Sequence, residues 1–170
     1  MIFMSQSGLA DRSREREWAA WYVEHLALML SVPGVLSAQR FQTESIGQPR
    51  SLAMYTMVSE DVFTDPQYQR VRGMGAWAPL IDRAHYRRNL FDGLESAPEV
   101  REDQVLVVAD RSAPGEADFE VSMSWLAAVA VDRSTPYRGI AVLPPEDAAR
   151  LTTREGLGIY VPVTPFQRKP

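Results

Sequence analysis

The strongest periodic pattern in the chain lies at residues 18–30, with the sequence WAAWYVEHLALML. Apolar and aromatic residues recur there at spacings of three and four, which is typical of one face of an amphipathic helix. This face consists of Trp18, Trp21, Tyr22, His25, Leu28 and Met29. We expect the helix to end at about Ser31, because Pro33 cannot continue a helix and Gly34 favours a turn. The helix therefore carries one titratable group, His25, in the middle of a heavy aromatic face.

Four segments of the first half have the short apolar pattern of β-strands. They are residues 1–5, expected to be an edge or first strand, 35–43, 51–58 and 86–91. A second helix is expected to begin at Pro66, because Asp65 can cap its first turn and proline suits the first helical position. A further helical stripe follows, consisting of Trp77, Leu80, Ile81, Ala84 and His85. The resulting order, β-α-β-β-α-β, is the ferredoxin-like pattern.

The second half repeats part of this order after a linker candidate at residues 93–103. Strand patterns occupy residues 104–109, 124–131, 138–143 and 158–163. A short helix is expected at 145–151, and a loop or short degenerate helix at 113–122. We therefore predict an α+β protein with two ferredoxin-like units, the first at residues 1–98 and a degenerate second repeat at 99–170.

The composition narrows the class of protein but not its reaction. The chain has 170 residues, of which 45% are hydrophobic and 24% charged, as in ordinary globular proteins. Its net charge is −4, whereas nucleic-acid binders usually carry a basic surplus, so we expect no nucleic-acid partner. The absence of cysteine excludes disulfides, thiolate metal ligands and a cysteine nucleophile. The absence of cysteine also leads us to expect a cytoplasmic protein. No apolar run approaches the ~20 residues of a membrane span, so we expect no membrane partner.

Four ordered segments of the first half resemble the EthD-like branch of the dimeric α/β-barrel superfamily. They are WYVEHL at 21–26, VPGV at 32–35, SAQRF at 37–41 and LAMY at 52–55. The resemblance covers about residues 1–92, and the second half has no equivalent of the WYVEHL helix. It implies antiparallel sheets packed as a dimeric α/β barrel, with the second repeat completing the barrel. The superfamily includes cofactor-independent monooxygenases, polyketide cyclases, lactone isomerases and haem enzymes, so the fold does not fix the reaction.

Three residues are candidates for catalysis. His25 has an unperturbed pKa near ~6.5 and can act as base or acid at neutral pH, although a histidine on an apolar helical face is often structural. Tyr55 can donate a hydrogen bond to a developing oxyanion, or it is a core tyrosine. Arg40 has the planar fork that binds a carboxylate or phenolate, or it forms a salt bridge between sheets.

Four further residues are candidates for binding a substrate. Trp21, Tyr22 and Trp77 can wall an aromatic pocket, although aromatic stripes are usually core, and His85 can be a second titrating group or a surface residue at a helix end. No metal site is expected, because the two histidines are sixty residues apart and lack metal-binding spacing. A phosphate-binding glycine loop is also absent from the sequence.

These residues lead us to expect a cofactor-independent enzyme acting on a small apolar, aromatic or polyketide-like substrate. His25 would transfer a proton, and Tyr55 and Arg40 would stabilise the enolate or phenolate, as in a lyase, isomerase or cyclase. Alternatives are a cofactor-free monooxygenase and a non-catalytic binding or assembly module. A haem enzyme is a third alternative that the resemblance leaves open. The superfamily also leads us to expect a homodimer.

Overall fold

A computed structural model describes residues 1–114, 121–151 and 156–169. The first half contains β1 (Ile2–Ser7), α1 (Glu15–Ser31), β2 (Val35–Gln42), β3 (Ser51–Met57), α2 (Pro66–Val71) and β4 (Arg87–Asp92). Its 3₁₀ turns are η1 (Arg12–Arg14), η2 (Glu60–Thr64), η3 (Gly75–Leu80) and η4 (Arg83–His85). The second half contains β5 (Val105–Arg111), β6 (Ser124–Val131), β7 (Tyr137–Leu143), α3 (Pro145–Ala149), β8 (Leu157–Pro162) and β9 (Gln167–Arg168). The order of the first half, β-α-β-β-α-β, is the predicted one.

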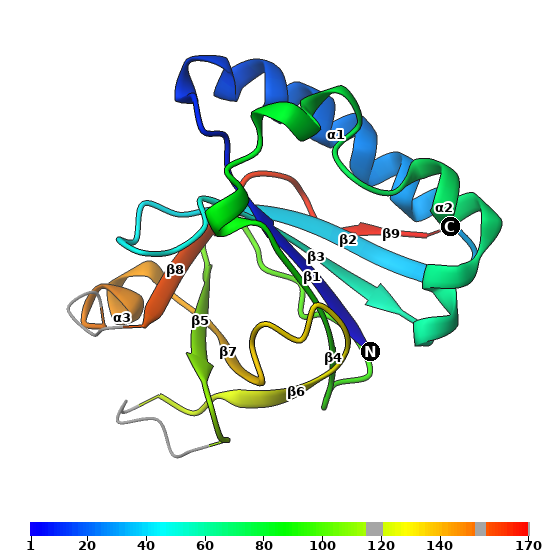
Figure 1. The fold of residues 1–170 in the computed structure, drawn as a ribbon. Helices are drawn as coiled ribbons and strands as arrows, with labels where there is room; N and C mark the ends of the chain where they lie inside the picture. The colour runs from blue at the N-terminus through cyan, green and yellow to red at the C-terminus, as the bar shows by residue number, and fades with distance from the viewer. Residues whose placement is uncertain (115–120, 152–155, 170) are drawn as a thin grey trace.

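The nine described strands form one antiparallel sheet in the order β3-β1-β4-β6-β7-β5-β8-β2-β9 (Figure 1). The sheet closes into a barrel because β2 also pairs with β3, which sets Ala38 opposite Tyr55. Three pairings join the halves, β4 with β6, β2 with β8 and β2 with β9. This confirms the predicted class, an α+β fold of the dimeric α/β-barrel type. The barrel closes within one chain, so the homodimer stays a prediction that the fold itself does not require.

Side chains alternate between the inside and the outside of the barrel, as the period of a strand dictates. On β1, Ile2 and Met4 belong to an apolar cluster inside the barrel, whereas Phe3 belongs to the cluster under α1. The other fully buried members of the inner cluster include Phe41, Leu52, Met54, Phe91, Leu106, Leu126 and Tyr160. β1 is the first strand, as predicted, and it is central, because β3 and β4 flank it.

A buried polar network crosses the barrel interior and joins the two halves. Arg138 on β7 has no exposed surface, and its Nε donates to Oδ1 of Asp110 at 2.7 Å. Its Nη2 donates to Oε1 of Gln6 on β1 at 2.6 Å. The amide of Gln6 in turn donates to the hydroxyl of Tyr160 at 3.1 Å, and burial raises the pKa of Tyr160 to about 12. The network satisfies a buried charge with partners from both halves, as a buried charge requires.

α1 covers the outer face of the first-half sheet (Figure 1). Its buried residues are Trp18, Tyr22, His25, Leu26 and Met29. Leu28, which we expected on this face, is 51% exposed, so that part of the prediction is wrong. Successive helical residues are about 100° apart around the axis, so Leu28 turns away from the sheet on one side of Met29. Leu26 takes the expected place of Leu28 in the core.

The turn after α1 requires glycine at position 34. Gly34 has φ +82°, a left-handed conformation that other residues rarely adopt. A Cβ at this position would lie 2.7 Å from Cγ2 of Val62 and 2.8 Å from Cγ2 of Val58. Gly34 therefore ends the helix and also lets the backbone of this turn lie close to the segment after β3.

The segment between β3 and β4 differs from the prediction. α2 begins at Pro66 as expected, with Asp65 accepting hydrogen bonds from the amides of Gln67 and Tyr68. The helical stripe expected around Trp77 to His85 is instead the two 3₁₀ turns η3 and η4. Pro79 lies inside η3, and proline has no amide proton to continue an α-helix.

The strands of the second half agree with the predicted ranges, and β9 is a short additional strand in the C-terminal tail. The loop or short helix expected at 113–122 lies largely outside the described residues, and the domain boundary at residue 98 stays a prediction.

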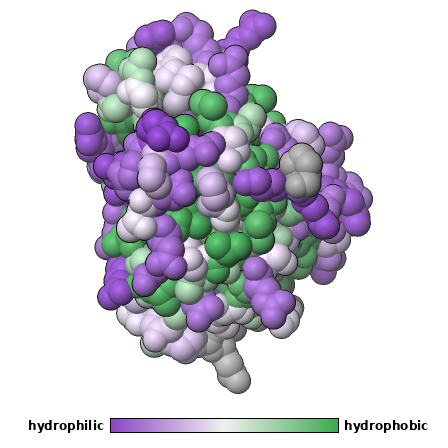
Figure 2. Space-filling model, turned by 90° about the vertical axis from the view of Figure 1, so that its right-hand side faces the viewer, coloured by the Kyte–Doolittle hydropathy of each residue, from purple (hydrophilic) through white to green (hydrophobic). Residues whose placement is uncertain are grey.

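Figure 2 shows the face at the right of Figure 1, where apolar side chains gather between polar ones. Apolar surface of this kind often marks protein contacts, so we retain the homodimer as a prediction.

Candidate active site

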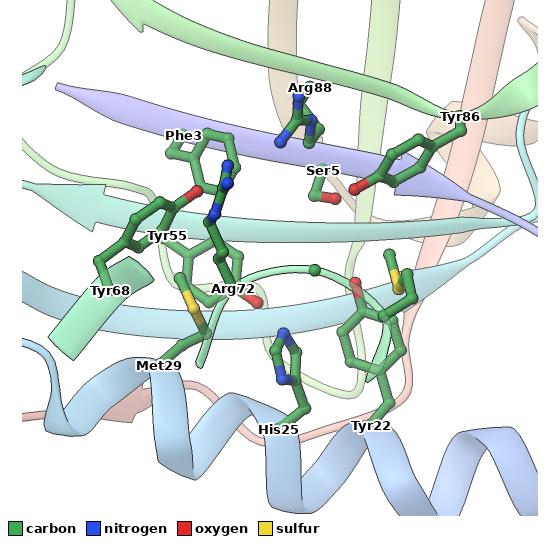
Figure 3. Close-up of a pocket in the computed structure, with 12 residues that line it drawn as sticks. Phe3, Ser5, Tyr22, His25, Met29, Tyr55, Tyr68, Arg72, Tyr86 and Arg88 are labelled. Atoms are coloured by element: carbon green, nitrogen blue, oxygen red, sulfur yellow. The ribbon is translucent and has the colours of Figure 1, made fainter. Parts of the chain in front are cut away.

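A cavity lies between α1 and the outer face of the first-half sheet (Figure 3). The space inside it that can hold the centre of a water molecule is about 20 Å³, so the cavity is narrow. β1 contributes Phe3 and Ser5, and α1 contributes Tyr22, His25 and Met29. The other lining residues are Tyr55, Tyr68, Arg72, Gly73, Met74, Tyr86 and Arg88. The polar ends of several side chains converge on one space, which is typical of a binding or catalytic site.

His25 is positioned by aromatic packing. Only 7% of its surface is exposed, and its ring stacks on Trp21 with centroids 4.7 Å apart and planes 13° apart. Tyr22 packs edge-on against it, with centroids 5.8 Å apart. Neither ring nitrogen forms a hydrogen bond with any residue in the described ranges, whereas a structural buried histidine normally has such a partner. Burial lowers the pKa of His25 to about 4, so the imidazole is neutral at pH 7 and can accept a proton.

Tyr22 and Tyr55 place two phenol groups beside the imidazole. Burial raises the pKa of Tyr22 to about 12 and raises that of Tyr55 well above its usual value. Both hydroxyls therefore stay protonated at pH 7 and can donate a hydrogen bond to a developing oxyanion. The ring of Tyr55 stacks on Phe3 at 5.6 Å, and Tyr22 packs edge-on against Trp18 at 5.4 Å. The cavity thus contains a base and two fixed donors.

The mouth of the cavity is positively charged. Arg72, which follows α2, is exposed and forms no ion pair within the described residues. Arg88 on β4 lies over the ring of Tyr86, with its Cζ 5.6 Å from the centroid. Its Nε is buried and has no hydrogen-bond partner in the described part of the chain. Burial raises the pKa of Tyr68 and of Tyr86. The positive charges of Arg72 and Arg88 act to lower both pKa values, so these charges lie near the two phenols.

Asp132, from the second half, holds Arg88 in place. Its Oδ1 accepts from Nη2 of Arg88 at 3.2 Å, and its Oδ2 accepts from the Arg88 amide at 2.8 Å. The flanking residues Val131 and Arg133 have φ values of 68° and 46°. Left-handed backbone is a clear outlier for a β-branched residue and persists only where the surroundings fix it. The second half therefore reaches the mouth of the cavity with a conformationally constrained turn.

The structure brings four of the seven predicted site residues together. His25, Tyr22 and Tyr55 line the cavity, and Trp21 supports the His25 ring. Arg40 lies behind Tyr22, with its Cζ 4.5 Å from the Tyr22 ring centroid and its Nε donating to Oγ of Ser51 at 3.0 Å. Its position allows it to orient Tyr22 without touching the cavity.

Trp77 and His85 lie elsewhere. Trp77 is buried in the core under α1, with the Arg14 guanidinium over its ring at 4.7 Å. Nδ1 of His85 lies 2.6 Å from Oδ2 of Asp82, at a surface turn. Neither residue lines the cavity.

The sequence reasoning missed Tyr68, Arg72, Tyr86 and Arg88. One signal was present for two of them, because Tyr86 and Arg88 are two residues apart at the expected fourth strand and therefore share a face. Tyr68 and Arg72 gave no such signal, since their approach to the cavity depends on how the segment after β3 folds back over the sheet.

The described residues contain neither an evident metal site nor a helix that could cross a membrane. Residues 1–114, 121–151 and 156–169 contain no group of three or more His, Asp or Glu side chains arranged to hold a metal ion. Within the same ranges, each helix is too short or too polar to cross a membrane.

Comparisons with known proteins identify the fold. No family model and no curated protein matches the sequence. Two crystal structures share the fold over 99% of this chain. One is a provisionally named monooxygenase from Lactobacillus acidophilus, with TM-score 0.56, 7% identity and 95% of that chain covered. The other is a provisionally named monooxygenase from Fusobacterium nucleatum, with TM-score 0.57, 9% identity and 94% of that chain covered. The likeness shows a fold of the dimeric α/β-barrel type.

Proposed function

We propose that this protein is a cofactor-independent enzyme of the EthD-like kind that removes a proton from a small aromatic or polyketide-like substrate. The supporting observation is His25, a neutral imidazole whose nitrogens have no partner among the described residues and which faces a cavity lined by phenol hydroxyls. The reaction class would be a lyase, isomerase or cyclase. The apolar part of the substrate would pack against Phe3 and Met29.

The first step would be proton abstraction by His25 from a carbon next to a substrate carbonyl. The C–H electron pair passes into the carbonyl group, and Tyr22 and Tyr55 donate hydrogen bonds to the resulting enolate oxygen. The imidazolium formed at His25 stabilises the same anion by charge attraction. Return of the proton to a different carbon completes an isomerisation. Attack of the enolate carbon on a second carbonyl, followed by loss of water, completes a cyclisation.

A second candidate is oxygenation without a cofactor, which the provisional names of the two solved structures favour. The same proton abstraction would leave a carbanion that reacts with O₂ to form a hydroperoxide. Loss of water then converts the original CH₂ into a carbonyl, so the substrate is oxidised and O₂ is reduced. Both candidates need the same base, and they differ only in what captures the carbanion.

The test is exchange of the substrate proton for deuterium, because exchange reports abstraction whatever step follows. The purified protein is incubated in D₂O with 2-tetralone and related aromatic ketones, and the loss of the acidic C–H signal is followed by NMR. We expect His25→Gln to slow exchange by about 10²-fold or more, as loss of a general base does. The matched control is His85→Gln, which removes the surface histidine and should exchange at the wild-type rate.

The outcome also separates the rival functions. Consumption of O₂ in step with exchange would favour the oxygenase over the isomerase or cyclase. Wild-type exchange by His25→Gln would contradict the proposal. Tight binding of aromatic ketones without exchange would show a binding module instead.

A further inference from the structure

We propose that Arg72 and Arg88 form a carboxylate-binding site at the mouth of the cavity, so that the substrate is an aromatic or polyketide-like carboxylic acid. The carboxylate would lie between the two guanidinium groups, and the reacting carbon would lie deeper, beside His25. Since this site belongs to the substrate of the proposed function, it rests on that function.

The charge at the mouth supports an anionic ligand. The charged groups that act on Tyr86 are Arg88, Asp132, Arg83 and Arg72, which are three cations and one anion. Asp132 pairs with Arg88 and leaves the charge of Arg72 uncompensated by any ion pair within the described residues. An anion entering the cavity therefore meets a local positive surplus, although the whole chain carries a net charge of −4.

The hydrogen bonds left open at Arg88 point the same way. Asp132 occupies its Nη2, and no residue in the described ranges accepts a hydrogen bond from its Nη1. A carboxylate is the best acceptor for a guanidinium donor. A purely structural salt bridge with Asp132 would explain the position of Arg88 but not the location of Arg72 at the same cavity.

An anionic substrate would also change the base. A negative charge near His25 favours the imidazolium form, so binding would raise the pKa of His25 from its low value in the empty cavity. The free enzyme would then hold a weak base, and the complex a stronger one. The carboxylate site and the proton-transfer site would thus work together through charge.

The test compares an acid with its neutral amide. Binding of 2-naphthoate and 2-naphthamide is measured at low ionic strength by quenching of tryptophan fluorescence, since Trp21 stacks on His25 beside the cavity. We expect 2-naphthoate to bind about ten-fold tighter than the amide, as charge-assisted hydrogen bonds allow. Arg72→Gln and Arg88→Gln should each remove most of this preference, because they should weaken binding of the acid more than binding of the amide.

The matched control is Arg87→Gln, which makes the same charge change at the neighbouring residue on the opposite face of β4. It should keep the preference for the acid. Equal binding of acid and amide by the wild type would overturn the proposal, and so would an equal loss of preference in Arg72→Gln and Arg87→Gln. Arg72 is exposed, so its variant tests the site even where Arg88→Gln fails to fold.

The two proposals can fail separately. Preference for the acid without any proton exchange would leave the carboxylate site standing and remove the proposed reaction. Exchange on neutral ketones without preference for the acid would leave the reaction standing and remove the carboxylate site.

Discussion

The two halves of the barrel have similar strands but very different outer faces. In the first half, the 17 residues of α1 cover the sheet, and a cavity lies between this helix and the strands. In the second half, the described cover includes α3, which has only 5 residues. The buried apolar cluster that α3 helps to form consists of Val105, Val107, Ala109, Ala148, Leu151 and Leu157. The titratable cavity lies on the half that has the long helix.

This difference suggests how the halves divide their roles. Tyr22, His25 and Met29 of α1 line the cavity of the first half. Under α3, Ala109 and Ala148 instead belong to an apolar cluster. The second half closes the barrel and supplies Asp132 to the mouth of the cavity. We therefore treat it as a support for the site of the first half.

The largest expected effect comes from breaking the network that joins the halves. Asp110→Ala leaves the buried Arg138 guanidinium without its carboxylate partner and should lower the free energy of unfolding by about 3–5 kcal/mol. Urea unfolding followed by circular dichroism measures this loss. The control is Asp103→Ala, which removes an exposed carboxylate paired with Arg101 and should cost less than about 1 kcal/mol. Similar losses in the two variants would show that the network does not hold the halves together.

The fold could be predicted from the sequence more completely than the residues of the site. Period-two strands and the Trp18–Met29 stripe predict β-α-β-β-α-β order, because each depends on residues close together in the chain. The stripe also identified His25 and Tyr22, since their helix can pack on the sheet by one face only. Leu28 was misplaced because its apolar character alone does not fix which edge of the stripe is buried.

The mouth of the cavity was less predictable, since it is built from distant segments. Arg72 comes from the irregular segment after α2, and Asp132 comes from a turn of the other half. Their approach depends on the pairing of β4 with β6, which no local pattern encodes. For Arg40 the strand was predicted correctly but the role was not. Its guanidinium lies over the ring of Tyr22 and does not reach the cavity.

The next effect concerns the pH dependence of stability. The pKa of His25 is about 4 in the folded protein and near 6.5 when unfolded, so the unfolded chain binds more protons between these values. Stability should therefore fall as pH decreases from 6.5 to 4, by at most about 3 kcal/mol from this group. Glutamine does not titrate, so His25→Gln lacks this contribution. As the pH falls from 6.5 to 4, the wild type should therefore lose more free energy of unfolding than the variant. Parallel profiles in thermal melts would show that His25 is not buried in neutral form.

The smallest effect tests whether the second half positions Arg88 or only neutralises it. Asp132→Asn keeps an oxygen acceptor and removes a charge, so 2-naphthoate should bind about three-fold tighter. Asp132→Ala also removes the charge but loses both hydrogen bonds to Arg88, so binding should become weaker than in the wild type. Asp103→Asn, the same charge change at an exposed site, should leave binding unchanged. If Asn and Ala at position 132 both tighten binding, Asp132 acts through its charge alone, and the constrained turn has no part in the site.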